Sequence, residues 1–319
     1  MEKKPLLQES GMEWEQAILQ RSIVLQEVDT GVFCGSKDDL YKPPGARGVF
    51  GGQTIAQSLH AAILSAPKEY LVHSLHGYFL LGGDPDRNIL FHVEKLREGG
   101  SFVSRSVEAR QRGKAIFTCM VQFHKPEPSL GLEVARTMPA VKGPEGLKSD
   151  RDLVVDLLKA NKLNERMREF YTNYLTSPAR AERRLAPPLE GFAPSASGFF
   201  SVTGRMSDDQ ELHLICLAYM SDMGQLTPAY VPFGGMQRNL PSMMVSLDHS
   251  MWFHSRNFRA DDWLLFEMRC MKATGARILS FCQVWTQSGE LVCSCTQEGL
   301  ARHKEPLRLP STTKPASKL

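Results

Sequence analysis

The chain has 319 residues, of which 42% are hydrophobic and 23% are charged, so it is long enough and apolar enough for two globular domains. Its formal net charge of +3 is too small to indicate a nucleic-acid partner, although it suits a small anionic ligand. We find no apolar run long enough to cross a bilayer, and the polar start of the sequence is unlike a signal peptide.

The first part of the chain predicts one helix among several strands. An opening strand is expected at residues 22–28. An alanine- and leucine-rich segment with helical periodicity follows the pair Gly51-Gly52, occupies residues 53–65 and ends before Pro67. Four runs of alternating hydrophobicity then predict strands, at residues 72–80, 89–97, 101–111 and 115–124.

The pattern changes in the middle of the chain, from residue 125 to residue 197. A charged amphipathic stretch at residues 151–171 predicts a helix, and prolines at 187, 188 and 194 are typical of a linker. Ser207 then begins a sequence with the spacing of a capping box. Residues 212–220 that follow are almost continuously apolar, which predicts a helix buried on all sides, as in a sheet that wraps one central helix.

The second half of the chain repeats the first. Residues 74–79 align with residues 247–252, which places His76 opposite His249, and a glutamate follows eighteen residues later in both copies, at Glu94 and Glu267. We therefore expect four segments: an N-terminal repeat at 1–125, a linker with a helical insertion at 126–197, a C-terminal repeat at 198–305 and a flexible tail at 306–319.

Three polar residues occur only in the second repeat. Asp222 lies near the end of the apolar helix, where the first copy has Leu59 or His60. In the same alignment Ser246 lies opposite His73, and Gln297 lies opposite Val121. Polar groups retained in one copy predict a single working site for each chain, built around the second repeat.

This polar trio, Asp222, Ser246 and Gln297, is suited to activating water. A carboxylate, a hydroxyl and an amide can hold one water molecule and accept its proton, which is what hydrolysis by direct water attack requires. A thioester suits this chemistry, because it needs only a positioned water and amide donors near the carbonyl oxygen. Gly51 and Gly52 could supply such donors, although tight packing at the start of a helix explains them equally well.

Other kinds of site fit less well. The Gly-x-Ser-x-Gly motif of α/β-hydrolases is absent, and Ser246, Asp248 and His249 lie too close on one strand to form a serine triad. The seven cysteines are odd in number and lack a disulfide framework, so we expect buried free thiols. No metal site is predicted and no metal or redox cofactor is expected.

The sequence ends in Ser317-Lys318-Leu319, which is the peroxisomal import address. The preceding segment is rich in proline and hydroxyl residues, so it is expected to stay flexible and within reach of an import receptor. This pattern predicts a location in the peroxisomal matrix but names no reaction.

Several strings resemble the thioesterase II family of acyl-CoA thioesterases. The resemblance covers residues 23–302, and its most specific string is Asp248-His249-Ser250-Met251-Trp252-Phe253-His254. The other strings are Phe50-Gly51-Gly52-Gln53, residues 73–79, Gly82-Gly83-Asp84-Pro85, residues 218–222 and Gln297-Glu298-Gly299.

The resemblance implies an α+β double hotdog fold, in which each of two tandem repeats is an antiparallel sheet wrapped around a central helix. It implies hydrolysis of fatty acyl-CoA to fatty acid and CoA, with the catalytic Asp, Thr or Ser, and Gln of the family at Asp222, Ser246 and Gln297. Gly51, Gly52 and His76 are weaker candidates for an oxyanion or substrate-positioning role. Basic residues of the first repeat are candidates for binding the CoA phosphates, at Arg47, Arg97, Arg105 and Arg110.

Two alternatives remain open at this stage. One is a hotdog-type enoyl-CoA hydratase, which would need a histidine paired with the carboxylate in one pocket. The other is an acyl-CoA binding protein with a vestigial site. A homo-oligomer is compatible with the sequence.

Overall fold

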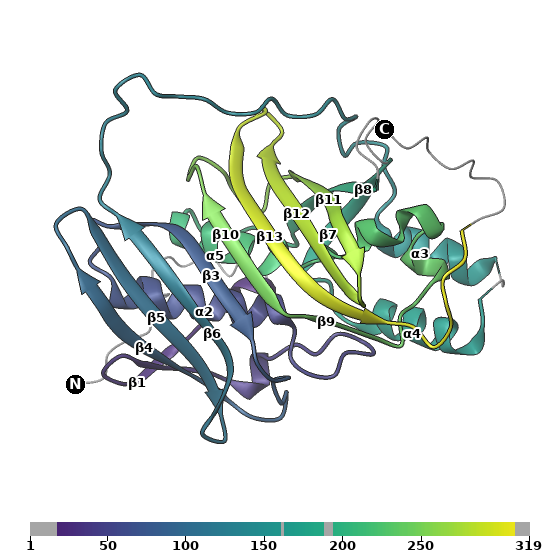
Figure 1. Ribbon diagram of the computed structural model, residues 1–319, viewed down its shortest axis with the longest axis horizontal. Coiled ribbons are helices and arrows are strands. Elements are labelled where there is room, and N and C mark those ends of the chain that lie inside the picture. Colours follow the sequence, from purple (N-terminus) through teal and green to yellow (C-terminus); the bar gives the residue numbers. More distant parts are fainter. Residues whose placement is uncertain (1–17, 161–162, 188–193, 310–319) are drawn as a thin grey trace.

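One antiparallel sheet and two long helices form the centre of the molecule (Figure 1). The computed structural model describes residues 18–160, 163–187 and 194–309. Within these residues the strand order is β1-β2-β4-β5-β6-β3-β10-β13-β12-β11-β8-β7, and β9 pairs with β13 beside this path.

The first repeat supplies half of the sheet and one of the long helices. Its elements are α1 (Ile18–Ser22), β1 (Gln26–Asp29), β2 (Val32–Gly35), η1 (Lys37–Asp39), α2 (Gly51–Ser65), β3 (Leu71–Phe79), β4 (Ile89–Glu98), β5 (Phe102–Gln111) and β6 (Lys114–His124). The alternation of the sequence is visible in the burial of these strands, since Val103, Val107 and Ala109 are buried on the helix side of β5.

The second repeat has the same order of one long helix and a run of strands. Its elements are β8 (Ser195–Val202), α5 (Gln210–Ser221), η2 (Thr227–Phe233), η3 (Met236–Arg238), β9 (Met243–Ser246), β10 (Asp248–Phe253), β11 (Leu264–Thr274), β12 (Arg277–Thr286) and β13 (Leu291–Arg302). The predicted α+β double hotdog fold is therefore confirmed.

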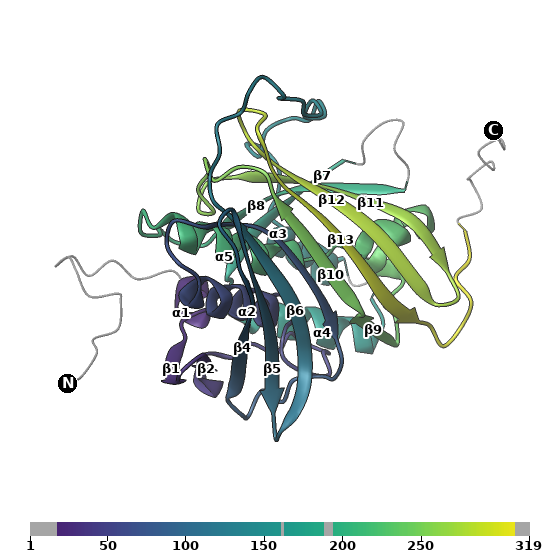
Figure 2. The same cartoon turned by 60° about the vertical axis from the view of Figure 1, so that its left-hand side comes forward.

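The two repeats join through hydrogen bonds between β3 and β10. Leu75 lies directly opposite Met251 across this junction, and both side chains are completely buried. The two half-sheets thus become one surface, and their inner faces share one hydrophobic core. Figures 1 and 2 show the first repeat, in purple to blue, beside the second repeat, in green to yellow.

Both long helices lie on the inner side of this sheet and pack against each other. Ten of the twelve residues of α5 are buried, which confirms the prediction of a helix enclosed on all sides. The first turn of α2 meets the last turn of α5 so closely that a Cβ atom at Gly52 would lie 2.4 Å from the carbonyl oxygen of Tyr219. Glycine at position 52 is what permits this approach.

The linker contains two helices and a strand, whereas the sequence predicted only one helix there. The amphipathic stretch predicted as one helix divides into α3 (Asp150–Lys159) and α4 (Glu165–Thr176), each with its own side-chain cap, from Ser149 and from Asn164. The strand β7 (Ala181–Ala186) was not predicted, because its arginines obscure the alternation. Arg183 of β7 is held by Asp150 of α3 at 2.6 Å.

Two local predictions were wrong. The strand expected at 22–28 begins only at Gln26, since Ser22 belongs to α1. The cap of α5 is Asp209, whose carboxylate accepts from the backbone N–H of Glu211, and not Ser207.

No described helix has the length and apolar character needed to cross a membrane.

The alignment of His76 with His249 also fails in three dimensions. His249 faces the core and is 0% exposed, whereas His76 lies on the outer, exposed face of β3. A displacement of one residue along a strand moves a side chain to the opposite face, and composition alone does not reveal it.

We predict that Gly52→Ala lowers the free energy of unfolding by about 1–3 kcal/mol, the usual result of overpacking. The added methyl group would collide with the backbone of Tyr219, which cannot turn away as a flexible side chain can. Urea unfolding followed by circular dichroism measures the change. Gly82→Ala is the matched control, because a Cβ atom there would meet no atom within 4 Å. Equal losses in both variants would contradict the prediction.

Candidate active site

The structure brings together the three polar residues that only the second repeat carries. Asp222 is the C-cap of α5, Ser246 is the last residue of β9, and Gln297 lies on β13. The Gln297 amide nitrogen donates to Asp222 Oδ1 at 2.7 Å and to Ser246 Oγ at 2.6 Å. Ser246 Oγ donates to Asp222 Oδ1 at 3.3 Å. The three side chains therefore form one closed hydrogen-bonded group.

Local backbone features explain why these residues meet. The chain turns sharply after α5 through Gly224, which has a positive φ of 83°. The following loop then lies on β13, where a Cβ atom at Gly299 would be 2.2 Å from the side chain of Leu226. Gly299 also pairs directly with Ser246 in the β13–β9 ladder. Gln297, two residues before Gly299 on the same face, consequently reaches both Ser246 and Asp222.

Accessibility differs within the trio. Gln297 is only 1% exposed, whereas Asp222 and Ser246 are half-buried and keep some accessible surface. A small molecule arriving at this group would thus meet the carboxylate and the hydroxyl first. The amide of Gln297 lies behind the carboxylate and the hydroxyl.

Desolvation dominates the electrostatics of Asp222. Burial raises the pKa of its carboxyl group above the ordinary value, against the opposing effects of the nearby His249 and of hydrogen bonds from Gln297, Gly52 and Ser246. A carboxylate with a raised pKa is a stronger base than an exposed one, so it is better able to take a proton from water.

The orientation of the Gln297 amide follows from its partners. Asp222 Oδ1 can only accept hydrogen bonds when the carboxyl group is ionised, so the amide must present its nitrogen to it. Both amide hydrogens are then used, one on Asp222 and one on Ser246. The amide oxygen points away from the carboxylate.

The two glycines expected to bind an oxyanion have different positions in the structure. The backbone N–H of Gly52 donates to Asp222 Oδ2 at 2.8 Å, so it holds the carboxylate rather than a substrate oxygen. Gly51 is the first residue of α2, where backbone N–H groups have no partner inside the helix. A Cβ atom at Gly51 would lie 2.8 Å from Asp222 Oδ2, so only glycine fits beside the carboxylate.

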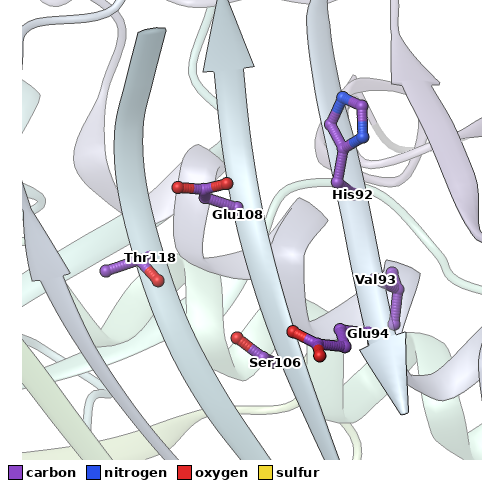
Figure 3. Close-up of a pocket in the computed structure, with 6 residues that line it drawn as sticks. All are labelled: His92, Val93, Glu94, Ser106, Glu108 and Thr118. Atoms are coloured by element: carbon purple, nitrogen blue, oxygen red, sulfur yellow. The ribbon is translucent and has the colours of Figure 1, made fainter.

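His76 is not brought to this group. Its ring packs against Trp252 on the outer face of the sheet, with ring centroids 5.0 Å apart. A hollow of about 310 Å³ lies on the same outer face, on strands β4, β5 and β6 (Figure 3). Its lining residues are His92, Val93, Glu94, Ser106, Glu108 and Thr118. Neither His76 nor this hollow contacts the trio, because the sheet separates the two faces.

Sequence reasoning missed His249 and Ser221 as neighbours of the site. His249 is completely buried on β10, and its Nε2 lies 2.8 Å from Ser221 Oγ. The Ser221 hydroxyl has Ala218 O and Met251 Sδ as acceptors for its one hydrogen, which assigns the donor role in the histidine contact to Nε2 of His249. The signal that could have indicated this role was the position of His249 beside Asp248 in the most specific string of the sequence.

Two of the four arginines expected to contact phosphate already form ion pairs with glutamates. Arg105 is 0% exposed and forms an ion pair with Glu98 at 2.7 Å. Arg110 pairs with Glu108 on its own strand. Arg47 and Arg97 are exposed, and Arg47 precedes the first turn of α2 by only a few residues.

The remaining candidate groups are the cysteine thiols and any cluster of side chains that could hold a metal ion. All seven cysteines lie in described residues and are free thiols; five of them are buried, as predicted, whereas Cys34 and Cys270 are only half-buried. In the described part of the chain, no group of three or more His, Cys, Asp or Glu side chains is arranged to hold a metal ion. The terminal tripeptide Ser317-Lys318-Leu319 lies outside the described residues.

Two family models match the chain. One is described as acyl-CoA thioesterase N-terminal domain and matches residues 40–124. The other is described as acyl-CoA thioesterase C-terminal domain and matches residues 157–301. Together they include both long helices and the polar trio.

Individual relatives agree with these models. The chain is 36% identical to "Acyl-coenzyme A thioesterase 8" of Rattus norvegicus, over 91% of this chain and 90% of that protein. It is 27% identical to "Peroxisomal acyl-coenzyme A thioester hydrolase 1" of Saccharomyces cerevisiae, over 81% of this chain and 86% of the relative. The solved structure of "Acyl-CoA thioesterase II TesB2" from Mycobacterium marinum superposes with a TM-score of 0.70 at 32% identity, covering 93% of this chain and 99% of the other.

We predict that the pKa of the Asp222 carboxyl group in the folded chain is higher than that of an exposed aspartate, because burial outweighs the donors around it. Carbon NMR titration of aspartate-labelled chain measures this pKa, with Asp222→Asn identifying the signal. Ser246→Ala should raise the pKa further, since one donor to the ionised form is lost. A midpoint at or below that of an exposed aspartate would show that the donors outweigh burial.

Proposed function

As a member of the thioesterase II family of acyl-CoA thioesterases this chain is an acyl-CoA hydrolase, and we propose that a water molecule activated by the trio of Asp222, Ser246 and Gln297 attacks the thioester of fatty acyl-CoA directly, with Asp222 and Ser246 holding the water and Gln297 holding both of them. The observation that carries this mechanism is the closed group of the three side chains around one half-buried carboxylate with a raised pKa. The products are a free fatty acid and CoA.

In the proposed reaction, Asp222 is the general base. The water oxygen forms a bond to the carbonyl carbon of the thioester while Asp222 takes one of the water protons. The resulting tetrahedral intermediate collapses when the carbon–sulfur bond breaks. The thiolate of CoA then receives the proton from Asp222, which restores the carboxylate for the next turnover.

Ser246 and Gln297 have supporting roles in this scheme. Ser246 lies at hydrogen-bond distance from the carboxylate and is half-buried, so its hydroxyl can share the attacking water with Asp222. Gln297 donates to both of them and fixes their relative position. Gly52 fixes the other carboxylate oxygen from the first repeat.

The carbonyl oxygen of the thioester gains negative charge during the attack and needs donors. We assign Gly51 to this role, because its backbone N–H lies at the start of α2, beside Asp222 and at the positive end of the helix. For the CoA phosphates we favour Arg47, which is exposed and precedes the same helix. Arg105 and Arg110 are already paired with glutamates.

The two alternative functions are less well supported. A hydratase requires a histidine that reaches the substrate together with the carboxylate. His249 is near Asp222, but it is completely buried and its Nε2 is bound to Ser221. A vestigial binding protein would not need a desolvated carboxylate held by three donors. Incubation with a long-chain acyl-CoA and a thiol reagent separates these functions, because only a thioesterase releases free thiol.

A peroxisomal location is part of the proposal. It is supported by the tripeptide Ser317-Lys318-Leu319 and by the peroxisomal name of the Saccharomyces cerevisiae relative. An import receptor that recognises the tripeptide would be the partner in this step.

We predict that Asp222→Asn lowers turnover by about a hundredfold or more while substrate binding survives, since the variant keeps the side-chain shape but loses the basic carboxylate. Ser246→Ala should lower turnover less, because it removes one hydrogen bond and leaves the base. Steady-state kinetics of thiol release give both values.

A covalent mechanism would reverse this order. If Ser246 were the nucleophile, its removal would abolish turnover and the wild type would accumulate an acyl-enzyme. Mass spectrometry of protein quenched during turnover detects such an adduct. An acyl group on Ser246 would refute direct attack by water.

We predict that removal of Leu319 leaves the activity unchanged and retains the protein in the cytosol, because an import receptor reads the complete tripeptide. Fluorescence microscopy of full-length and shortened proteins, with a peroxisomal marker, measures the location. Peroxisomal import of the shortened protein would show that another signal is used.

A further inference from the structure

A layer of uncharged polar side chains lies behind the trio, on the side away from Ser246. Gln225, in the loop three residues after Asp222, is 1% exposed, and Ser280, on β12, is 0% exposed. Neither residue belongs to the water-activating group described above. Together with Gln297, they place three uncharged polar side chains in the interior of the second repeat.

The sheet register places Ser280 beside Gln297. The two residues are directly opposite each other in the β12–β13 ladder, so their side chains project from the same face as neighbours. Gln225 covers this pair from the loop, and its amide nitrogen lies 3.4 Å from the backbone carbonyl oxygen of Ser280. The three side chains therefore converge on one small region.

Three buried atoms in this region have no hydrogen-bond partner within the protein. They are Gln297 Oε1, Ser280 Oγ and Gln225 Oε1. A buried polar atom without a partner is destabilising, and native proteins usually satisfy such atoms with protein groups or with a bound water molecule. Two of the three atoms can only accept, and the third is a hydroxyl that can donate.

This combination matches one water molecule. A water can donate one hydrogen to each amide oxygen and accept the hydrogen of the serine hydroxyl, which makes the three bonds typical of buried waters. We propose that Ser280 and Gln225 are positioning residues, which act through one buried water molecule to hold the Gln297 amide with its nitrogen toward Asp222. This inference rests on the proposed role of the trio.

The orientation of the amide matters because its two ends are nearly the same in shape and opposite in polarity. With the nitrogen inward, Gln297 donates to Asp222 and to Ser246. After a rotation of half a turn, the amide oxygen would face the acceptor Oδ1 of Asp222 and both donations would be lost. The amide oxygen would then repel the carboxylate that the amide nitrogen now stabilises. The groups that hold the attacking water would no longer be fixed in place.

Other groups around Asp222 affect the pH dependence. His249 on β10 and Tyr219 on α5 are the titratable side chains that face Asp222, and Gly52 contributes a backbone dipole from α2. His249 Nδ1 is also buried without a partner. With Nε2 directed to Ser221, Nδ1 is the acceptor nitrogen of a neutral ring, so His249 does not supply a donor to the Gln297 oxygen.

The test measures turnover and its pH dependence in full-length protein with a long-chain acyl-CoA. Ser280→Ala should lower kcat by about tenfold with little change in KM, because the group it positions acts on the water and not on substrate binding. The acid limb of the kcat profile should move to higher pH, since the ionised carboxylate loses donors. Gln225→Met, which keeps the volume and removes the amide, should have the same two effects.

Ser195→Ala is the matched control. Ser195 is also a completely buried strand serine whose hydroxyl has no partner, but it lies on β8, opposite Arg269 and away from the trio. Its loss should leave both kcat and the acid limb unchanged. Equal effects of Ser195→Ala and Ser280→Ala would show a general effect on stability and would overturn the inference.

A double variant separates this inference from the proposed function. In a Gln297→Ala background, Ser280→Ala should have no further effect on kcat, because there is no amide left to orient. If the two effects instead multiply, Ser280 does not act through Gln297 and the inference is wrong. If Gln297→Ala alone retains full turnover, the proposed role of the trio is wrong.

Discussion

The structure of the site depends on holding one desolvated carboxylate, that of Asp222. Burial disfavours its charge, and the carboxylate is tolerated because donors surround it: Gly52 from the first repeat, and Ser246 and Gln297 from the second. All of these donors are uncharged, and no described lysine or arginine forms an ion pair with Asp222. Neutral donors position the carboxylate and leave it basic, whereas a cation at contact distance would lower its pKa strongly.

The need for donors from both repeats explains why the two repeats form one body. Gly52 reaches Asp222 only because the first turn of α2 packs on the last turn of α5. That contact in turn requires the half-sheets to be joined at β3 and β10. The first repeat has no trio of its own, and its contribution is a helix start and half of the core. The polar trio of the second repeat and the helix start of the first thus give a single site that neither repeat could form alone.

Much of this arrangement was predictable from the sequence, because strong local signals agreed with one another. The alternation of the strands, the apolar helix before Asp222 and the polar residues confined to one repeat all indicated the fold and the trio. The side on which a histidine lies was not predictable, since the two aligned histidines face opposite sides of the sheet: His249 is buried in the core and His76 is exposed. The role of Gly52 was also hidden, because its donation to Asp222 spans 170 positions in the chain and depends on how two helices pack.

The polar layer behind the trio shows how far the site extends beyond the reacting groups. Gln297 is 1% exposed and its two hydrogens are already engaged, so it has little freedom to act on substrate. Its contribution to the site depends on which end of its amide faces Asp222. That orientation must be set by the groups that contact the amide oxygen. Ser280 lies at that end through the register of β12 and β13, and Gln225 lies there through the turn at Gly224. The same turn that ends the helix at Asp222 therefore also places Gln225 behind Gln297. It links the position of the base to the proposed orientation of its principal donor.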